Sequence, residues 1–219
     1  MSKLLTFFTD PSSQMGEALR KLRINLNFVS VDITLSSLIV TSSIPSEGKS
    51  TIATNLAVAY AKVGKKILLV DANFHSPILH KAFVKDNMCG LSNLLLGNGL
   101  LAKVLQPTGN DNLLLLTAGP GFPDVADLIG SEKMKALLEE MEADFDMVIF
   151  DSSAVLASSD AQALSAIAAG TLLVTDYGRV TRDEVREAVG YLRSVNSNIL
   201  GVVLNKVPLN NEGYYYFPS

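Results

Sequence analysis

The chain has 219 residues, of which 48% are hydrophobic and 18% charged, with a formal net charge of −4 at pH 7. These values exclude a disordered chain, favour one α/β domain over two, and argue against a nucleic-acid-binding protein, which usually carries a basic surplus. The single cysteine, Cys89, excludes an internal disulfide. The sequence shows neither a secretory signal nor an apolar run near the ~18 residues that cross a bilayer. We therefore expect a cytoplasmic protein.

The first predicted element is a helix over about residues 12–29, and apolar runs then alternate with helix-period segments. The runs are rich in Val, Ile and Leu without polar alternation, which is typical of strands that are covered on both faces. They predict strands at 37–42, 66–71, 112–118, 146–151, 171–176 and 198–205. Helices are expected at 50–63, 131–143, 158–169 and 181–195, the last with Thr181 and Glu184 at capping-box spacing. This alternation predicts an α/β fold with a mostly parallel, twisted sheet and helices on both faces.

Two segments fall outside the alternation. Residues 74–110 form a long connection that contains a short helix between glycines. Residues 208–219 contain two prolines, Asn-Asn and a glycine, and are expected to be a flexible tail that holds three of the six tyrosines. We therefore expect one domain over 1–207, followed by a tyrosine-rich tail.

Residues 42–51, SSIPSEGKST, connect the first predicted strand to the following helix. Their Gly-Lys-Ser end is diagnostic of a P-loop, although Ser43 replaces the usual first glycine. In such a loop, successive backbone N–H groups and the helix dipole hold phosphate. Lys49 is expected to reach the terminal phosphates, and the Ser50 hydroxyl to ligate Mg²⁺. The sequence therefore predicts a nucleoside triphosphate site at Ser46, Glu47, Gly48, Lys49, Ser50 and Thr51.

Two aspartates end apolar runs. Asp151 follows VIF, as expected of a Walker B aspartate that holds Mg²⁺ through water. Asp71 follows ILLV, and its carboxylate would also face the phosphates because ligands gather at the carboxyl ends of parallel strands. The alternative for each is a strand-end aspartate that caps the next helix.

With these residues, the chain resembles the bacterial tyrosine kinases (BY-kinases) of capsule and exopolysaccharide synthesis, which are P-loop proteins related to the MinD/ParA ATPases. The resemblance runs from about residue 15 to the end. It rests on PSEGKST, on Asp71 in an additional Walker motif, on EALRKLR, on the segment 180–207, and on the terminal tyrosines. Ile44 stands where MinD/ParA proteins carry a signature lysine, which favours the kinase branch.

The resemblance implies an ATP- and Mg²⁺-dependent tyrosine autokinase with Lys49, Asp71 and Asp151 as catalytic residues. Asp71 would orient or deprotonate the tyrosine hydroxyl. The acceptors would be Tyr214, Tyr215 and Tyr216 of a neighbouring subunit. The family's E-x-x-R-x-x-R helix, here Glu17, Arg20 and Arg23, implies self-association into a ring, and Glu17 and Arg20 are spaced to pair on one helix face. A membrane adaptor would recruit the protein to the inner face of the membrane and complete the active site.

Three departures from the family pattern bear on activity. The extra Walker motif, usually D-x-D-x-R, reads DANFH, with Asn73 and His75, and an amide cannot accept the tyrosyl proton. Walker B, usually D-x-P-P, reads DSSA, with Ser153 and Ala154, which predicts a looser segment after Asp151. The tyrosine cluster is short and contiguous.

These departures leave two alternatives to the kinase: an ATP-binding switch or pseudokinase of the same machinery, and a MinD/ParA-like positioning ATPase. Asn205, in LNKV, is a further candidate. It either contacts the adenine or is a turn residue at the end of its strand.

Overall fold

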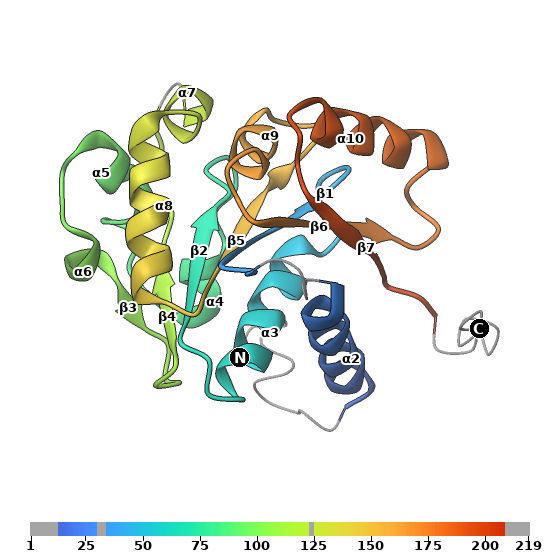
Figure 1. The fold of residues 1–219 in the computed structure, drawn as a ribbon, viewed down its shortest axis with the longest axis horizontal. Coiled ribbons are helices and arrows are strands. Elements are labelled where there is room, and N and C mark those ends of the chain that lie inside the picture. Colours follow the sequence, from blue (N-terminus) through green and yellow to red (C-terminus); the bar gives the residue numbers. More distant parts are fainter. Residues whose placement is uncertain (1–12, 30–33, 123–124, 209–219) are drawn as a thin grey trace.

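The computed structural model describes residues 13–29, 34–122 and 125–208. Within them, seven strands form one sheet in the order β3-β4-β2-β5-β1-β6-β7 (Figure 1). The strands are β1 (Ser37–Ser42), β2 (Ile67–Ala72), β3 (Gln106–Pro107), β4 (Leu113–Leu116), β5 (Met147–Ala154), β6 (Gly170–Asp176) and β7 (Ile199–Asn205). The helices are α2 (Gln14–Val29), α3 (Lys49–Ala61), α4 (Leu79–Phe83), α5 (Leu91–Leu96), α6 (Leu101–Val104), α7 (Val125–Ile129), α8 (Glu132–Asp144), α9 (Asp160–Ser165) and α10 (Arg182–Ser194). The predicted α/β fold with a mostly parallel sheet is confirmed.

Successive residues of the central strands supply two separate cores. In β1, Leu38 and Val40 belong to the core that includes α2 and α3, whereas Ile39 belongs to the core that includes α8. The three side chains are fully buried, and each such burial contributes roughly 1.5–3 kcal/mol to folding. This two-sided burial explains why the strand sequences are apolar without alternation.

The carboxyl ends of the parallel strands meet at one edge of the sheet. All neighbouring pairs are parallel except β3 and β4, which are antiparallel. The loops that follow β1, β2, β5, β6 and β7 therefore lie together at this edge, where sheets of this kind bind ligands.

The structure differs from the predicted elements in three places. The segment after Asp151 is not loose: β5 continues to Ala154, because serine and alanine keep the backbone N–H groups that proline would remove. Helix α9 is shorter than the predicted 158–169. Strand β3 is too short to leave a periodic pattern, and its pairing with β4 was not predicted. The Thr181–Glu184 capping box is confirmed.

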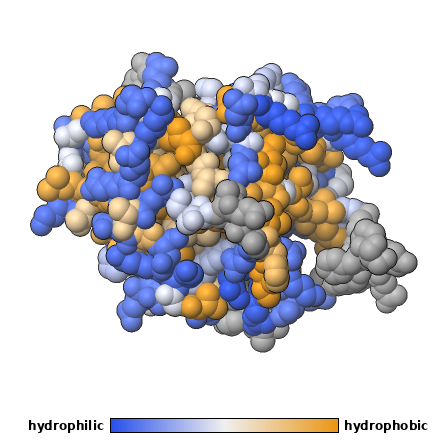
Figure 2. Space-filling model, viewed as in Figure 1, coloured by the Kyte–Doolittle hydropathy of each residue, from blue (hydrophilic) through white to orange (hydrophobic). Residues whose placement is uncertain are grey.

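Helix α2 packs against α3 at one side of the sheet (Figure 1). Leu19 and Leu26 are buried there, and the Tyr60 hydroxyl of α3 donates to Asn27 Oδ1 at 3.0 Å. At the surface, Figure 2 shows apolar residues beside α10, where the edge strand β7 half exposes Val202 and Leu204. In the part of the chain that the structure describes, the helices are too short or too polar to span a bilayer.

Candidate functional site

The segment between β1 and α3 has the backbone of a phosphate-binding loop. Ser46 has φ 70° and Gly48 has φ 97°, so left-handed residues flank Glu47, and α3 begins at Lys49. Such alternation forms a concave nest of N–H groups at a helix N-terminus, which binds anions. The left-handed conformation costs a non-glycine residue about 1–2 kcal/mol, so Ser46 needs support from its surroundings.

Glu47 and Gly48 give the loop that support from within. The fully buried Glu47 side chain accepts hydrogen bonds from the Ile44 N–H at 2.7 Å and from the Asp176 N–H at 2.8 Å. A Cβ on Gly48 would lie 2.2 Å from Asn205 Nδ2, so only glycine fits there. Glu47 was predicted as a nucleotide contact, and the structure shows that its side chain braces the loop.

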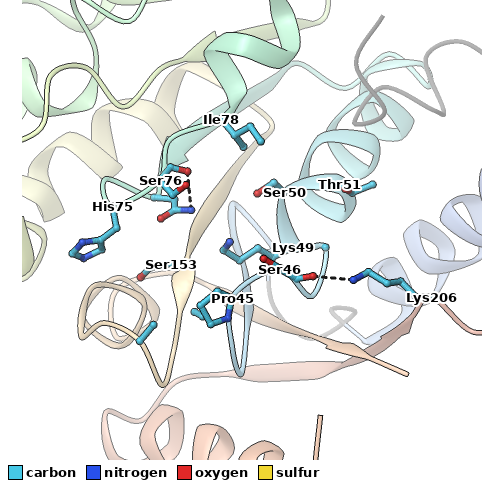
Figure 3. Close-up of a pocket in the computed structure, with 14 residues that line it drawn as sticks. Pro45, Ser46, Lys49, Ser50, Thr51, His75, Ser76, Ile78, Ser153 and Lys206 are labelled. Atoms are coloured by element: carbon cyan, nitrogen blue, oxygen red, sulfur yellow. Dashed lines mark hydrogen bonds between the residues drawn. The ribbon is translucent and has the colours of Figure 1, made fainter. Parts of the chain in front are cut away.

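A pocket of about 510 Å³ opens over this loop, which is within the size range of ligand sites. Figure 3 shows Lys49 and Ser50 on one wall, His75 and Ser76 on the opposite wall, and Lys206 at the flank of the loop. The pocket lining thus includes the predicted residues Ser46, Gly48, Lys49, Ser50 and Thr51, together with Asn73, His75 and Ser153.

Asp71 and Asp151 lie side by side, because they are register partners in the parallel strands β2 and β5, but neither is among the residues that line the pocket. Both are fully buried. Burial raises the pKa of Asp151 to about 7, and the negative charge of Asp71 acts in the same direction, whereas Lys49 and the Ser50 hydroxyl oppose it. Burial also raises the pKa of Asp71 to about 6, against three backbone hydrogen bonds and the charge of Lys49.

The two carboxylates differ in their partners. Neither oxygen of Asp151 makes a well-formed hydrogen bond to a described residue, and a buried carboxylate of this kind beside the P-loop serine fits a divalent cation. Asp71, in contrast, accepts hydrogen bonds from the backbone N–H groups of Asn73, Ile78 and Leu79 at 3.2, 3.0 and 2.9 Å. Because Leu79 is the first residue of α4, Asp71 caps the start of that helix and shapes the loop before it.

Asn73 and His75, two of the residues that depart from the family pattern, sit in this loop and contact its neighbours. Asn73 is buried and its amide nitrogen donates to the Ser76 carbonyl at 3.2 Å. His75 Nε2 lies 3.2 Å from both Ser158 Oγ and the buried Asp160 Oδ2. One ring nitrogen meets both groups, so this is not a Ser-His-Asp relay, which uses the two nitrogens separately.

The predicted self-association residues lie on α2, away from the pocket. Arg20 pairs with Glu17, as the spacing predicted. Arg23 turns toward α3, and its buried Nε has no hydrogen-bond partner in the described part of the chain. The predicted acceptors Tyr214, Tyr215 and Tyr216 lie outside the described residues.

Sequence reasoning missed the residues that hold the site together. Asp160, Asp176 and Lys206 contact the loops around the pocket, yet each lies far along the chain from its partners. The only signal was the Asn-Lys pair at the end of an apolar run, which pointed to Asn205 alone.

A P-loop at the head of α3, with paired aspartates in the carboxyl-terminal halves of neighbouring strands, defines a P-loop nucleotide-binding protein. The family model described as an AAA domain matches residues 46–197. The chain is 39% identical to the tyrosine-protein kinase YwqD of Bacillus subtilis (strain 168), over 98% of this chain and 92% of that protein.

Solved structures agree with this relationship. The chimerical protein CapA2B2 superposes with a TM-score of 0.90 at 34% identity, over 95% of this chain and 92% of that one. The kinase domain of the Escherichia coli tyrosine kinase ETK gives a TM-score of 0.90 at 30% identity, over 99% and 84% of the two chains. The chain belongs to the bacterial tyrosine-protein kinases, enzymes of the nucleotide-binding P-loop class.

Proposed function

We propose that this protein is an ATP- and Mg²⁺-dependent tyrosine autokinase that regulates capsular or exopolysaccharide synthesis and phosphorylates its C-terminal tyrosines in trans. The observation that carries the catalytic part is the buried pair of Asp71 and Asp151, which are register partners and lie close enough to Lys49 of the P-loop for its charge to lower both pKa values. Phosphoryl transfer depends mainly on positioning and on neutralising charge, and these residues are suited to both.

Each residue of this group has a proposed role. Lys49 neutralises the transferring phosphoryl group from the first turn of α3. Ser50 and Asp151 would hold the metal, Asp151 through water, since neither oxygen of the buried Asp151 carboxylate makes a well-formed hydrogen bond to a described residue. When bound, Mg²⁺ supplies positive charge next to the phosphate oxygens. Ser46, Gly48 and Thr51 shape the rest of the phosphate site.

Asp71 is the proposed residue for orienting or deprotonating the tyrosine hydroxyl. Its raised pKa suits a base, whereas its three backbone hydrogen bonds favour the orienting role, because they fix the loop that carries Asn73 and His75 into the pocket.

The proposed assembly uses α2. Glu17, Arg20, Ile24 and Phe28 follow one face of this helix, where Ile24 is 44% and Phe28 73% exposed. A stripe that combines charge pairs with exposed apolar side chains suits contact with another subunit, and Arg23 lies on the same helix. We propose a ring-like homo-oligomer, in which the kinase domain spans 1–207 and the tyrosine-rich tail spans 208–219.

A membrane adaptor is the second proposed partner. It would recruit the protein to the inner face of the membrane and complete the active site. This proposal rests on the family resemblance.

A second candidate function follows from Asn73 and His75. Asn73 brings an amide into the pocket where the family has a carboxylate, and a site with one acid fewer fits an ATP-binding switch that transfers phosphate poorly.

Mixing two complementary variants tests the kinase proposal. Lys49→Met keeps the tyrosines but removes the phosphoryl-neutralising lysine. Replacement of Tyr214, Tyr215 and Tyr216 by Phe keeps the site but removes the acceptors. Each variant alone should give no phosphotyrosine with labelled ATP and Mg²⁺, whereas the mixture should label the Lys49→Met chain, identified by a size tag. No label on the wild type, even with an activator present, would refute the kinase and favour the switch.

A further inference from the structure

Two residues at the end of β7 bind consecutive carbonyl groups of the phosphate loop. Lys206 Nζ donates to the Ser46 carbonyl at 2.9 Å, and Figure 3 shows Lys206 reaching the loop from the flank of the pocket. Asn205 Nδ2 donates to the Glu47 carbonyl at 2.9 Å. Both carbonyls belong to the part of the loop that has left-handed backbone at Ser46 and Gly48.

The clamp formed by Asn205 and Lys206 is itself fixed by the neighbouring strand. Lys206 Nζ also donates to Asp176 Oδ2 at 2.6 Å, and Asp176 is 6% exposed. The Asp176 N–H in turn donates to Glu47 Oε1, while the Lys206 N–H donates to Asn205 Oδ1. These bonds form a closed network between the ends of β6 and β7 and the loop.

We propose that Asn205 and Lys206 are positioning residues for nucleotide binding, which hold the phosphate loop in its binding shape. The C=O and N–H of a trans peptide point in opposite directions. Fixing the carbonyls of Ser46 and Glu47 toward β7 therefore aims the N–H groups of Glu47 and Gly48 the other way, toward the phosphate side of the loop. The inference rests on the proposed ATP site.

This role differs from a direct contact with the nucleotide. Both polar atoms of the Asn205 side chain are engaged, one with Glu47 and the other with Lys206, so Asn205 acts through the loop. Lys206 has two of its three ammonium hydrogens directed to Ser46 and Asp176. A loop that lacks the clamp is competent for only part of the time, and the apparent affinity falls by that fraction. The association rate therefore falls, while the dissociation rate of the bound nucleotide is unchanged.

Stopped-flow binding of a fluorescent ADP analogue with Mg²⁺ to the full chain tests this. Lys206→Met should lower the association rate about tenfold and leave the dissociation rate within about twofold of the wild type. Lys206→Arg, which can still donate to both acceptors, should recover the association rate to within about threefold of the wild type. Lys103→Met, an exposed lysine on α6, is the matched control and should bind like the wild type. Circular dichroism and the unfolding midpoint verify that each variant is folded.

Equal association rates for wild type and Lys206→Met would overturn the proposal. If dissociation of the variant were faster as well, the result would show that Lys206 touches the nucleotide. Wild-type protein that fails to bind the probe would overturn the ATP site together with the clamp.

Discussion

Replacing Asp151 by Asn should stabilise the protein without nucleotide and remove its response to Mg²⁺. Asp151 is fully buried beside Asp71, and burial raises its pKa from 3.8 to about 7. A carboxyl group whose pKa is higher in the folded state holds its proton more tightly there than in the unfolded chain. The folded wild type therefore loses stability as the pH rises from about 4 to about 7, and the loss is complete above that range.

The size of the effect follows from the same shift. A change from 3.8 to about 7 corresponds to roughly 4 kcal/mol at pH 8, at 1.36 kcal/mol per unit. Because the new amide would also be buried without a hydrogen-bond partner in the described part of the chain, we expect about 2–4 kcal/mol. For a domain of this size, that raises the melting temperature by roughly 5–10 °C.

Urea unfolding at pH 5.5 and pH 8, with and without Mg²⁺ and ADP, measures these quantities. At pH 8 without nucleotide, Asp151→Asn should unfold at higher urea than the wild type, and the difference should shrink at pH 5.5. Added Mg²⁺ and ADP should stabilise the wild type more than the variant. Asp111→Asn, which changes an exposed aspartate in the same way, is the control and should unfold like the wild type. A variant that is no more stable than the wild type at pH 8, or a difference that does not change with pH, would refute the reasoning.

Three further predictions concern other residues of the site. Lys49→Met should lower phosphotyrosine formation by roughly 100-fold or more in a labelled-ATP assay, and undiminished label would place catalysis elsewhere. His75→Ala should destabilise the protein by about 1 kcal/mol in urea unfolding, because it leaves the buried Asp160 without its imidazole neighbour, whereas His75→Arg should not; equal stability of the two would contradict this. Gly48→Ala should lose roughly 1–3 kcal/mol of stability, since the new Cβ would meet Asn205 at 2.2 Å in a left-handed conformation, and an unchanged midpoint would show that the loop can move aside.

The sheet could be predicted because its signal is local. A strand buried on both faces reads as a run of Val, Ile and Leu, so β1, β2, β5, β6 and β7 were placed within a few residues. The carboxyl end of β5 lies three residues beyond the predicted end. The missing prolines of the family pattern indicated a loop there, whereas Ser153 and Ala154 retain the N–H groups that let the strand continue. The edge strand β3 has two residues and cannot show a period.

The site likewise contains residues that could be predicted from local sequence and residues that could not. Lys49 and Ser50 belong to a contiguous motif, and Asp71 and Asp151 end apolar runs, so their convergence on one edge of the sheet could be argued from topology. The support that Glu47 gives the loop could not be predicted, because its carboxylate accepts a hydrogen bond from the Asp176 N–H, which is 129 residues away in sequence. In the sequence alone, a loop glutamate that becomes buried cannot be distinguished from one that stays exposed.

Helix α3 links the two proposed activities of this protein mechanically. It begins at the phosphate loop with Lys49 and reaches α2 near its other end, where Tyr60 donates to Asn27. Its 13 residues form a rod about 20 Å long, with one end at the nucleotide and the other at the assembly helix. If subunit contact through α2 tightens nucleotide binding by some factor, thermodynamic linkage requires that nucleotide strengthen subunit contact by the same factor. The same factor should be obtained from the nucleotide affinity measured at several subunit concentrations and from the subunit affinity measured at several nucleotide concentrations.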